Sequence, residues 1–154
     1  MAKYKLTALI VSFVIVFLVA ALGSIFTSST VNSVWYESTK PPITPPNYVF
    51  PIAWTILFIL IALSMFFSWS ESKKSDKKKV AAVFAVNLVL NVLWSILYFG
   101  LQNPLLAFIE LIIFWLSILA MIIVLFRISK KSAYMLIPYL LWVSFAAFLN
   151  FLSI

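Results

Sequence analysis

The chain has 154 residues, 65% of them hydrophobic and 10% charged, with a mean hydropathy of +1.15 and a net charge of +7. One domain of this length cannot remove so much apolar surface from water, so the composition excludes a soluble protein and makes the bilayer the main solvent. The chain has no cysteine and no histidine, which excludes disulfides, thiolate chemistry and most zinc or haem ligation by those residues.

Five apolar runs are each long enough, at roughly 20 residues, to cross the hydrocarbon core of a bilayer. We expect helices, because a lone segment in lipid has no other way to pair its backbone polar groups, and the alternating pattern of barrel strands is missing. The first run is longer than the apolar part of a signal peptide, so we expect it to be retained. The sequence predicts an all-α integral membrane protein, a five-transmembrane-helix bundle forming a single domain. We place the spans near residues 6–26, 48–69, 80–99, 104–126 and 133–152.

The basic residues predict the orientation of this bundle. With five spans, the N-terminus and the second and fourth loops share one side, which carries every lysine and arginine except Lys40. This asymmetry predicts a cytoplasmic N-terminus and a C-terminus outside the cell membrane. The run ESKKSDKKK, residues 71–79, alternatively suggests binding of anionic lipid or nucleic acid. Because its charges flank span ends, we favour the topological interpretation and expect no nucleic-acid partner. The residues on the predicted cytoplasmic side are Lys3, Lys5, Lys73, Lys74, Lys77, Lys78, Lys79, Arg127, Lys130 and Lys131.

The loop between the first two spans covers residues 27–47. It overlaps a proline-rich stretch, WYESTKPPITPPNYVFPIAW at residues 35–54, that holds five of the seven prolines. Prolines fix the backbone and restrict the residue before them, so the loop is predicted to be rigid. Pro46 is expected in the first turn of the second span, and Pro51 is expected to bend or loosen the start of that span. Two interpretations stay open: a stiff connector with interfacial aromatic residues, or a lid over a cavity between the helices.

Three of the spans carry faces that do not suit lipid. The second has an aromatic residue at every fourth position, and the third has amide and hydroxyl side chains at the same spacing with aromatic neighbours. The fifth mixes large, small and polar groups. Any one asparagine is explained by helix–helix hydrogen bonding, whereas the whole set, lying under the loop, favours a ligand pocket. The residues are Phe50, Trp54, Phe58, Asn87, Asn91, Trp94, Ser95, Tyr98, Trp142, Ala146, Leu149 and Asn150.

The stretch from Trp35 to the C-terminus resembles the TspO/MBR (tryptophan-rich sensory protein or translocator protein) family. The resemblance is carried by the blocks WYESTKPPITPP, AWTILFILIALS, NLVLNVLWSILYFG and PYLLWVSFAAFLN. It implies a five-helix membrane protein, a homodimer, that binds porphyrins such as protoporphyrin IX and haem under its first loop; some members bind sterols and isoquinoline- or benzodiazepine-type drugs. Carried over by motif, the implied lining is Tyr36, Pro45, Phe50, Trp54, Phe58, Asn87, Asn91, Trp94, Ser95, Trp142, Ala146 and Leu149.

Two features depart from the family pattern. Family members commonly have an aromatic residue where this chain has Ile43, and we expect this change to weaken one wall of the pocket. The sterol motif of animal members needs a basic residue near the end of the fifth span, and none follows Lys131. Only a reversed version of that motif, from Lys131 to Leu136, is present, so the sequence gives little support to sterol binding.

A porphyrin suits the pocket that the resemblance implies. Its flat apolar macrocycle stacks on indole and phenyl rings, and its propionates need donors, for which Tyr36, Lys40 and the indole N–H groups are candidates. No histidine, cysteine or pocket-face methionine offers an axial ligand, so free porphyrin suits the site as well as haem does. We predict no obligatory cofactor, no metal site and no catalytic residue.

The sequence favours a sensor or carrier of tetrapyrroles and leaves two alternatives. One is a light- and oxygen-dependent porphyrin-degrading enzyme, an activity proposed for the family, although the chain offers no evident nucleophile–base pair. The other is an ion-coupled exporter using Glu110, the only acidic residue well inside a span. For assembly, Ala81 and Ala85 form a small-xxx-small pair on the third span and predict a homodimer seam there.

Overall fold

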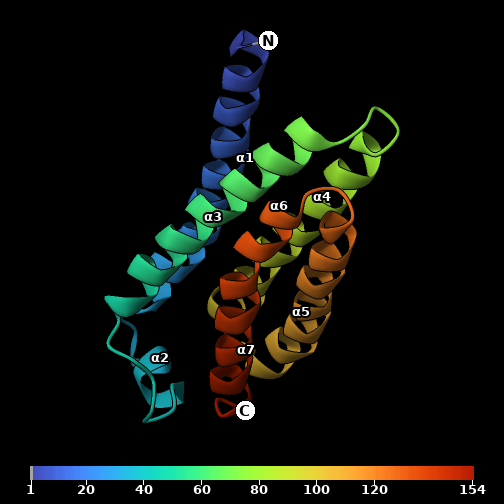
Figure 1. Cartoon of the computed structure of the whole chain (residues 1–154). Helices are drawn as coiled ribbons and strands as arrows, with labels where there is room; N and C mark the ends of the chain where they lie inside the picture. The colour runs from blue at the N-terminus through green and yellow to red at the C-terminus, as the bar shows by residue number, and fades with distance from the viewer. Residues whose placement is uncertain (1) are drawn as a thin grey trace.

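The computed structural model describes residues 2–154, and all regular structure among them is helical (Figure 1). Five helical stretches are long and apolar enough to cross a membrane, which confirms the predicted fold: Lys3–Thr30, Val49–Glu71, Lys77–Gly100, Pro104–Phe126 and Lys130–Phe151. The elements are α1 (Ala2–Thr30), α2 (Val34–Thr39), α3 (Val49–Glu71), α4 (Lys77–Ser95), the π-helical turn η1 (Ile96–Gly100), α5 (Pro104–Phe126), α6 (Lys130–Met135) and α7 (Ile137–Phe151).

The first connection contains more helix than the sequence predicted. Helix α1 continues to Thr30 instead of ending near residue 26, and the hydroxyl side chains of its last turns are paired with carbonyls of the preceding turn, as Ser29 is with Phe26 (2.9 Å). A short helix, α2, then lies inside the stretch predicted as loop. Ser33 caps α2 by accepting a hydrogen bond from the Tyr36 amide (3.2 Å). The irregular part of the connection is therefore confined to the residues on either side of α2.

Prolines set two helix boundaries. Helix α3 begins at Val49, so Pro51 lies in its first turn and removes no bond from the helix interior. Pro51 thus takes the place expected for Pro46, which lies before the helix and accepts a hydrogen bond from the Val49 amide (2.9 Å). The fifth span is two helices, because Pro138 has no amide hydrogen to continue α6, and the break falls at Leu136.

Helix α1 packs on α3 and α4, α5 packs on α4 and α7, and α6 packs on α3. Glycines allow the closest of these approaches: a Cβ added to Gly23 of α1 would lie 3.4 Å from Ser95 Oγ, and one added to Gly100 would lie 3.0 Å from the Phe26 ring. Both contacts lie in the C-terminal half of α1. Figure 1 shows the first turns of α1 extending past the ends of the other helices, and Tyr4 in these turns is bonded to Trp69 of α3 (3.1 Å).

The two ends of the bundle differ in charge. We call the end with α2, the 101–103 turn and the C-terminus the loop end (Figure 1). The opposite end, with the N-terminus and the turns at 72–76 and 127–129, is called the basic end, because it carries every lysine and arginine except Lys40. The helices thus bring the basic residues together as their order in the sequence required.

Candidate functional site

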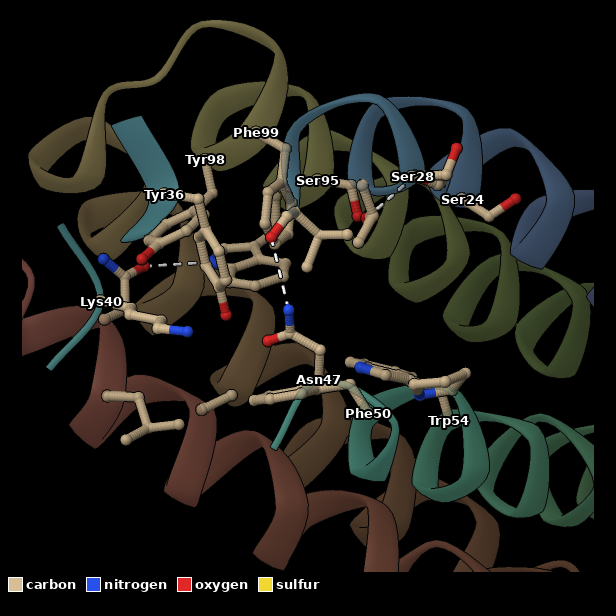
Figure 2. A pocket seen from close by; sticks show the side chains of 18 of the residues that line it. Ser24, Ser28, Tyr36, Lys40, Asn47, Phe50, Trp54, Ser95, Tyr98 and Phe99 are labelled. Atoms are coloured by element: carbon tan, nitrogen blue, oxygen red, sulfur yellow. Dashed lines mark hydrogen bonds between the residues drawn. The ribbon is translucent and has the colours of Figure 1, made fainter. Parts of the chain in front are cut away.

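A cavity of about 340 Å³ lies under the loop that follows α1, and we call it the loop cavity. Its walls come from the C-terminal half of α1, the start of α3, the end of α4 with η1, and the last turns of α7. Figure 2 shows loop residues Tyr36, Lys40 and Asn47 approaching it from one side and Phe50 and Trp54 of α3 from another. Its size is within the range of small-molecule sites, which starts at about 300 Å³.

Most of the residues expected to form a binding site border this cavity. They come from four separate segments of the chain and meet only through the fold. Whether they bind a ligand stays a prediction. The residues are Tyr36, Phe50, Trp54, Phe58, Asn91, Trp94, Ser95, Ala146 and Leu149.

Pro45 and Trp142, two further residues of the predicted set, do not border the loop cavity. The turn closed by the hydrogen bond from the Thr44 amide to the Pro41 carbonyl (2.9 Å) presents Pro41 and Thr44 to the cavity in place of Pro45. The Trp142 ring packs edge-on against Phe50, with 6.0 Å between ring centroids. Trp142 therefore supports a cavity wall from behind.

Asn87, the third residue outside the lining, joins helices in the core. Its side chain is fully buried; its amide donates to Ser117 Oγ on α5 (2.9 Å), and its oxygen accepts from the Tyr139 hydroxyl on α7 (3.1 Å). Tyr139 in turn accepts from the amide of Asn91 (3.4 Å), which does border the cavity. A continuous chain of buried hydrogen bonds therefore connects the cavity wall to three helices.

The wall formed by α4 and η1 is fixed by its own hydrogen bonds. The π-helical turn is closed by a bond from the Leu101 amide to the Ile96 carbonyl (2.8 Å), and such turns are frequent at functional sites. Within it, the Tyr98 hydroxyl donates to Ser153 Oγ (3.0 Å) near the C-terminus. The ring of Tyr98 stacks on Trp94, at 5.3 Å and 22°, so this wall contains a stacked pair of aromatic rings.

The loop supplies the polar end of the cavity. Lys40 Nζ pairs with Glu37 Oε1 at 2.7 Å and lies 5.5 Å from the centre of the Tyr36 ring. Burial, with smaller contributions from the neighbouring Tyr98 and Glu37, raises the pKa of Tyr36 to about 12, so its hydroxyl remains a donor at neutral pH.

Two buried polar atoms at this end have no hydrogen-bond partner among residues 2–154. They are Thr44 Oγ1 and Asn47 Oδ1, and both residues border the cavity. Buried polar atoms are nearly always paired in folded proteins, so this end of the cavity is suited to a ligand that brings its own polar group. We call Tyr36, Lys40, Thr44 and Asn47 the polar roof.

The sequence prediction missed the contribution of α1. Gly23, Ser24, Thr27 and Ser28 all border the cavity, and their spacing of three and four places them on one face of a helix. That spacing was the available signal, but hydroxyl side chains are also common at places where they only bond to their own helix, as Thr27 does to Gly23 (3.3 Å).

Comparison with known proteins identifies the family. The TspO/MBR family profile matches residues 11–153. The chain belongs to the TspO/MBR family. It is 40% identical to the tryptophan-rich protein TspO of Archaeoglobus fulgidus over 144 residues, which cover 93% of this chain and 92% of that protein. It is 39% identical to the tryptophan-rich protein TspO of Chlorobaculum tepidum over 132 residues, 84% and 82% of the two chains. Over 120 residues, 76% and 71% of the two chains, it is 32% identical to the translocator protein of Ovis aries.

The TspO/MBR match covers every residue that borders the loop cavity. Ile43 is more than half exposed (55%) and lies outside the lining of the loop cavity. The effect of an isoleucine at this position on the pocket stays a prediction.

Glu110 lies on α5, away from the cavity lining of this TspO/MBR protein. Its side chain is 6% exposed, and neither carboxyl oxygen has a hydrogen-bond partner among residues 2–154. Among the described residues, no group of three or more acidic, histidine or cysteine side chains is placed to hold a metal ion. Glu110 is thus an isolated buried acid, separate from the polar roof.

Proposed function

We propose that this multi-pass TspO/MBR membrane protein binds porphyrin-type tetrapyrroles, such as protoporphyrin IX, in the loop cavity and acts as their sensor or carrier. The observation that carries the proposal is that two different segments each place a stacked pair of aromatic rings at the loop cavity. Trp54 stacks on Phe58 of α3 at 5.4 Å and 29°, and Trp94 stacks on Tyr98 at 5.3 Å and 22°. A planar apolar macrocycle gains most from such surfaces, because stacking adds to the burial of its area.

The polar roof favours a ligand with both an apolar and a polar part, rather than a purely apolar ligand. A carboxylate of the ligand can take the place of Glu37 beside Lys40, an exposed pair whose exchange costs little. Tyr36 adds a hydroxyl donor at the same end. The propionate groups of a porphyrin would then lie at the loop end, with the ring between the aromatic walls.

The decisive experiment is a titration of the purified protein with protoporphyrin IX in the dark, followed by illumination of the complex in air. Saturable binding with no new product supports a sensor or carrier. Light-dependent loss of porphyrin with turnover would favour the degrading enzyme instead. Failure to bind in either condition would rule out the proposed ligand class.

One observation favours a second candidate, ion-coupled export. Glu110 is an acid buried in a spanning helix without a hydrogen-bond partner among residues 2–154, and intramembrane acids commonly take part in proton movement. A porphyrin-dependent proton flux in sealed vesicles would support this candidate over simple carriage.

We also propose that the basic end faces the cytoplasm and the loop cavity faces the outer side of the cell membrane. The proposal is supported by the placement of every lysine and arginine except Lys40 at one end of the bundle. Ligand would then enter from the outer side or from the outer leaflet.

A further inference from the structure

A second cavity, of about 300 Å³, lies toward the basic end between α1, α3 and α4, and we call it the inner groove. It shares no lining residue with the loop cavity. Its walls are almost entirely aliphatic and aromatic. The one hydroxyl in its lining, that of Ser12, donates to the Ala8 carbonyl at 2.8 Å. The inner groove is therefore suited to a purely apolar group.

The inner groove exists because α1 diverges from α4. Contacts at Gly23 and Gly100 hold the C-terminal half of α1 close to α4 and η1. Toward its N-terminus α1 is joined to α3, through the bond from Trp69 to Tyr4 (3.1 Å), and a gap remains between α1 and α4. Ala81 and Ala85 of α4 line the resulting space and are too small to fill it. The space beside these exposed alanines is lined by apolar atoms and is not filled by the protein. Within the membrane, a lipid chain or another apolar segment would have to fill it.

A cationic side chain, Lys77, lies at the basic-end rim of the inner groove. Trp69 closes this rim, since its indole Nε1 donates to the Tyr4 hydroxyl of α1 (3.1 Å). Lys77 Nζ lies 4.4 Å from the centre of the Trp69 ring and donates to the Trp69 carbonyl (2.6 Å). Ten lysine and arginine residues share this end of the bundle with only two acids, Glu71 and Asp76.

We propose that the inner groove binds one acyl chain of an anionic phospholipid from the leaflet at the basic end, with the lipid phosphate beside Lys77. The apolar walls match a hydrocarbon chain, whose burial is favourable for each methylene covered. The basic rim matches an anionic headgroup, because lysine and arginine side chains near the membrane surface attract anionic lipids. This site is independent of the porphyrin proposal.

Charge also favours a lipid over a second copy of this chain. An anionic headgroup neutralises the ten basic residues at this end, whereas a second copy in the same orientation adds ten more, whichever face it uses. Ala81 and Ala85, which the sequence predicted as a dimer seam, line the inner groove. Our proposal assigns this pair to lipid, and the test below separates the two occupants.

The test compares lipid retention by native mass spectrometry after purification in mixed phosphatidylglycerol and phosphatidylcholine with identical chains. The unmodified protein should retain phosphatidylglycerol in preference to phosphatidylcholine. Ala85→Phe fills the groove and should lower retention of both lipids on the order of tenfold, through loss of buried methylenes. The matched control is Ala82→Phe, the same change at an exposed position of α4 outside the groove lining, and it should change nothing.

A second variant separates the headgroup from the chain. Lys77→Gln keeps the groove and should reduce the preference for phosphatidylglycerol by roughly fivefold, with phosphatidylcholine retention unchanged. Melting curves and porphyrin titrations of all variants show that the bundle is folded and that the loop cavity is intact. Equal lipid retention by Ala85→Phe and Ala82→Phe would overturn the site, and an unchanged preference in Lys77→Gln would overturn the headgroup assignment. Loss of a dimer in Ala85→Phe with unchanged lipid counts would assign the groove to a second copy instead.

Discussion

The indole Nε1 of Trp94 donates a hydrogen bond to Oδ1 of Asn150 at 3.1 Å, joining the cavity wall on α4 to the last turn of α7. The amide of Asn150 donates in turn to the Pro104 carbonyl at the start of α5 (2.9 Å). Trp94 can therefore offer a ligand its ring face but not its N–H group. Trp54, the other tryptophan of the cavity lining, differs, because its indole N–H has no hydrogen-bond partner within residues 2–154 and remains able to donate to a ligand.

The first prediction concerns the stability of this junction. Asn150→Leu keeps a similar side-chain volume but leaves the part-buried Trp94 N–H without its partner and removes the bond from Asn150 to the Pro104 carbonyl, so we expect a loss of about 1–3 kcal/mol in the free energy of unfolding. Thermal unfolding in detergent measures the change. Ser153→Ala is the control: it removes the partner of Tyr98 at the loop end, where water can replace the bond, and should cost less. Equal losses in both variants would contradict the structural role of Asn150.

The second prediction concerns the aromatic walls. Trp54→Ala removes a ring that borders the loop cavity, so porphyrin affinity should fall by about 1–3 kcal/mol, roughly tenfold to a hundredfold. Trp142→Ala should cost less than Trp54→Ala, because Trp142 only supports Phe50. Trp69→Phe changes a residue of the inner groove and should leave affinity unaltered. Fluorescence quenching on titration with protoporphyrin IX measures all three, and identical affinities would mean that no such binding site exists.

The third prediction uses the unpartnered atoms of the polar roof. In the free protein, Asn47→Leu removes a buried oxygen that has no partner in residues 2–154 and one long hydrogen bond, from the Asn47 amide to the Val31 carbonyl (3.5 Å), so thermal stability should change little. With porphyrin present, the same variant should bind more weakly by about 1–3 kcal/mol, because the ligand loses a polar contact. Ser38→Ala, at an exposed position of α2, should alter neither quantity. A parallel fall in stability and affinity would show that Asn47 serves the loop alone.

How far the sequence predicted the site depends on what periodicity can encode. The i, i+4 spacing of Phe50, Trp54 and Phe58 correctly placed three side chains on one face of α3, and all of them border the loop cavity. Spacing does not say which neighbour a face meets. Asn87 and Asn91 share a face of α4, yet their depth differs by one turn, and only Asn91 reaches the cavity.

The rest of the site depends on structure without a periodic signature. The π-helical turn after Ser95 has no mark of its own in the spacing, because Phe99 also continues the i, i+4 series of Asn91 and Ser95 to the cavity wall. The roof residue Asn47 lies in an irregular segment whose path is fixed by turns, such as the one between Pro41 and Thr44. Helix α1 is apolar on nearly all sides and exposed over most of its length. The hydrophobicity of its residues therefore did not distinguish the face that borders the cavity from its other faces.

The fourth prediction concerns Glu110. An isolated acid in a spanning helix is accommodated most easily in its neutral form, and glutamine is a neutral side chain of nearly the same shape. Glu110→Gln should therefore change thermal stability at neutral pH and porphyrin affinity very little. If the protein couples porphyrin movement to protons, the same variant should abolish proton flux in vesicles while binding persists. Flux that survives the substitution would remove Glu110 from any transport mechanism.

The last prediction concerns orientation, and the chain makes the test clean because it has no native cysteine. Ser75 lies in the exposed turn between α3 and α4 at the basic end, and Ser38 is exposed on α2 at the loop end. In intact cells, a membrane-impermeant maleimide should label Ser38→Cys, whereas Ser75→Cys should react only after the membrane is opened. Detergent-solubilised protein is the control, in which both variants should react. Labelling of Ser75→Cys alone in intact cells would invert the bundle, and the loop cavity would then receive its ligand from the cytoplasm.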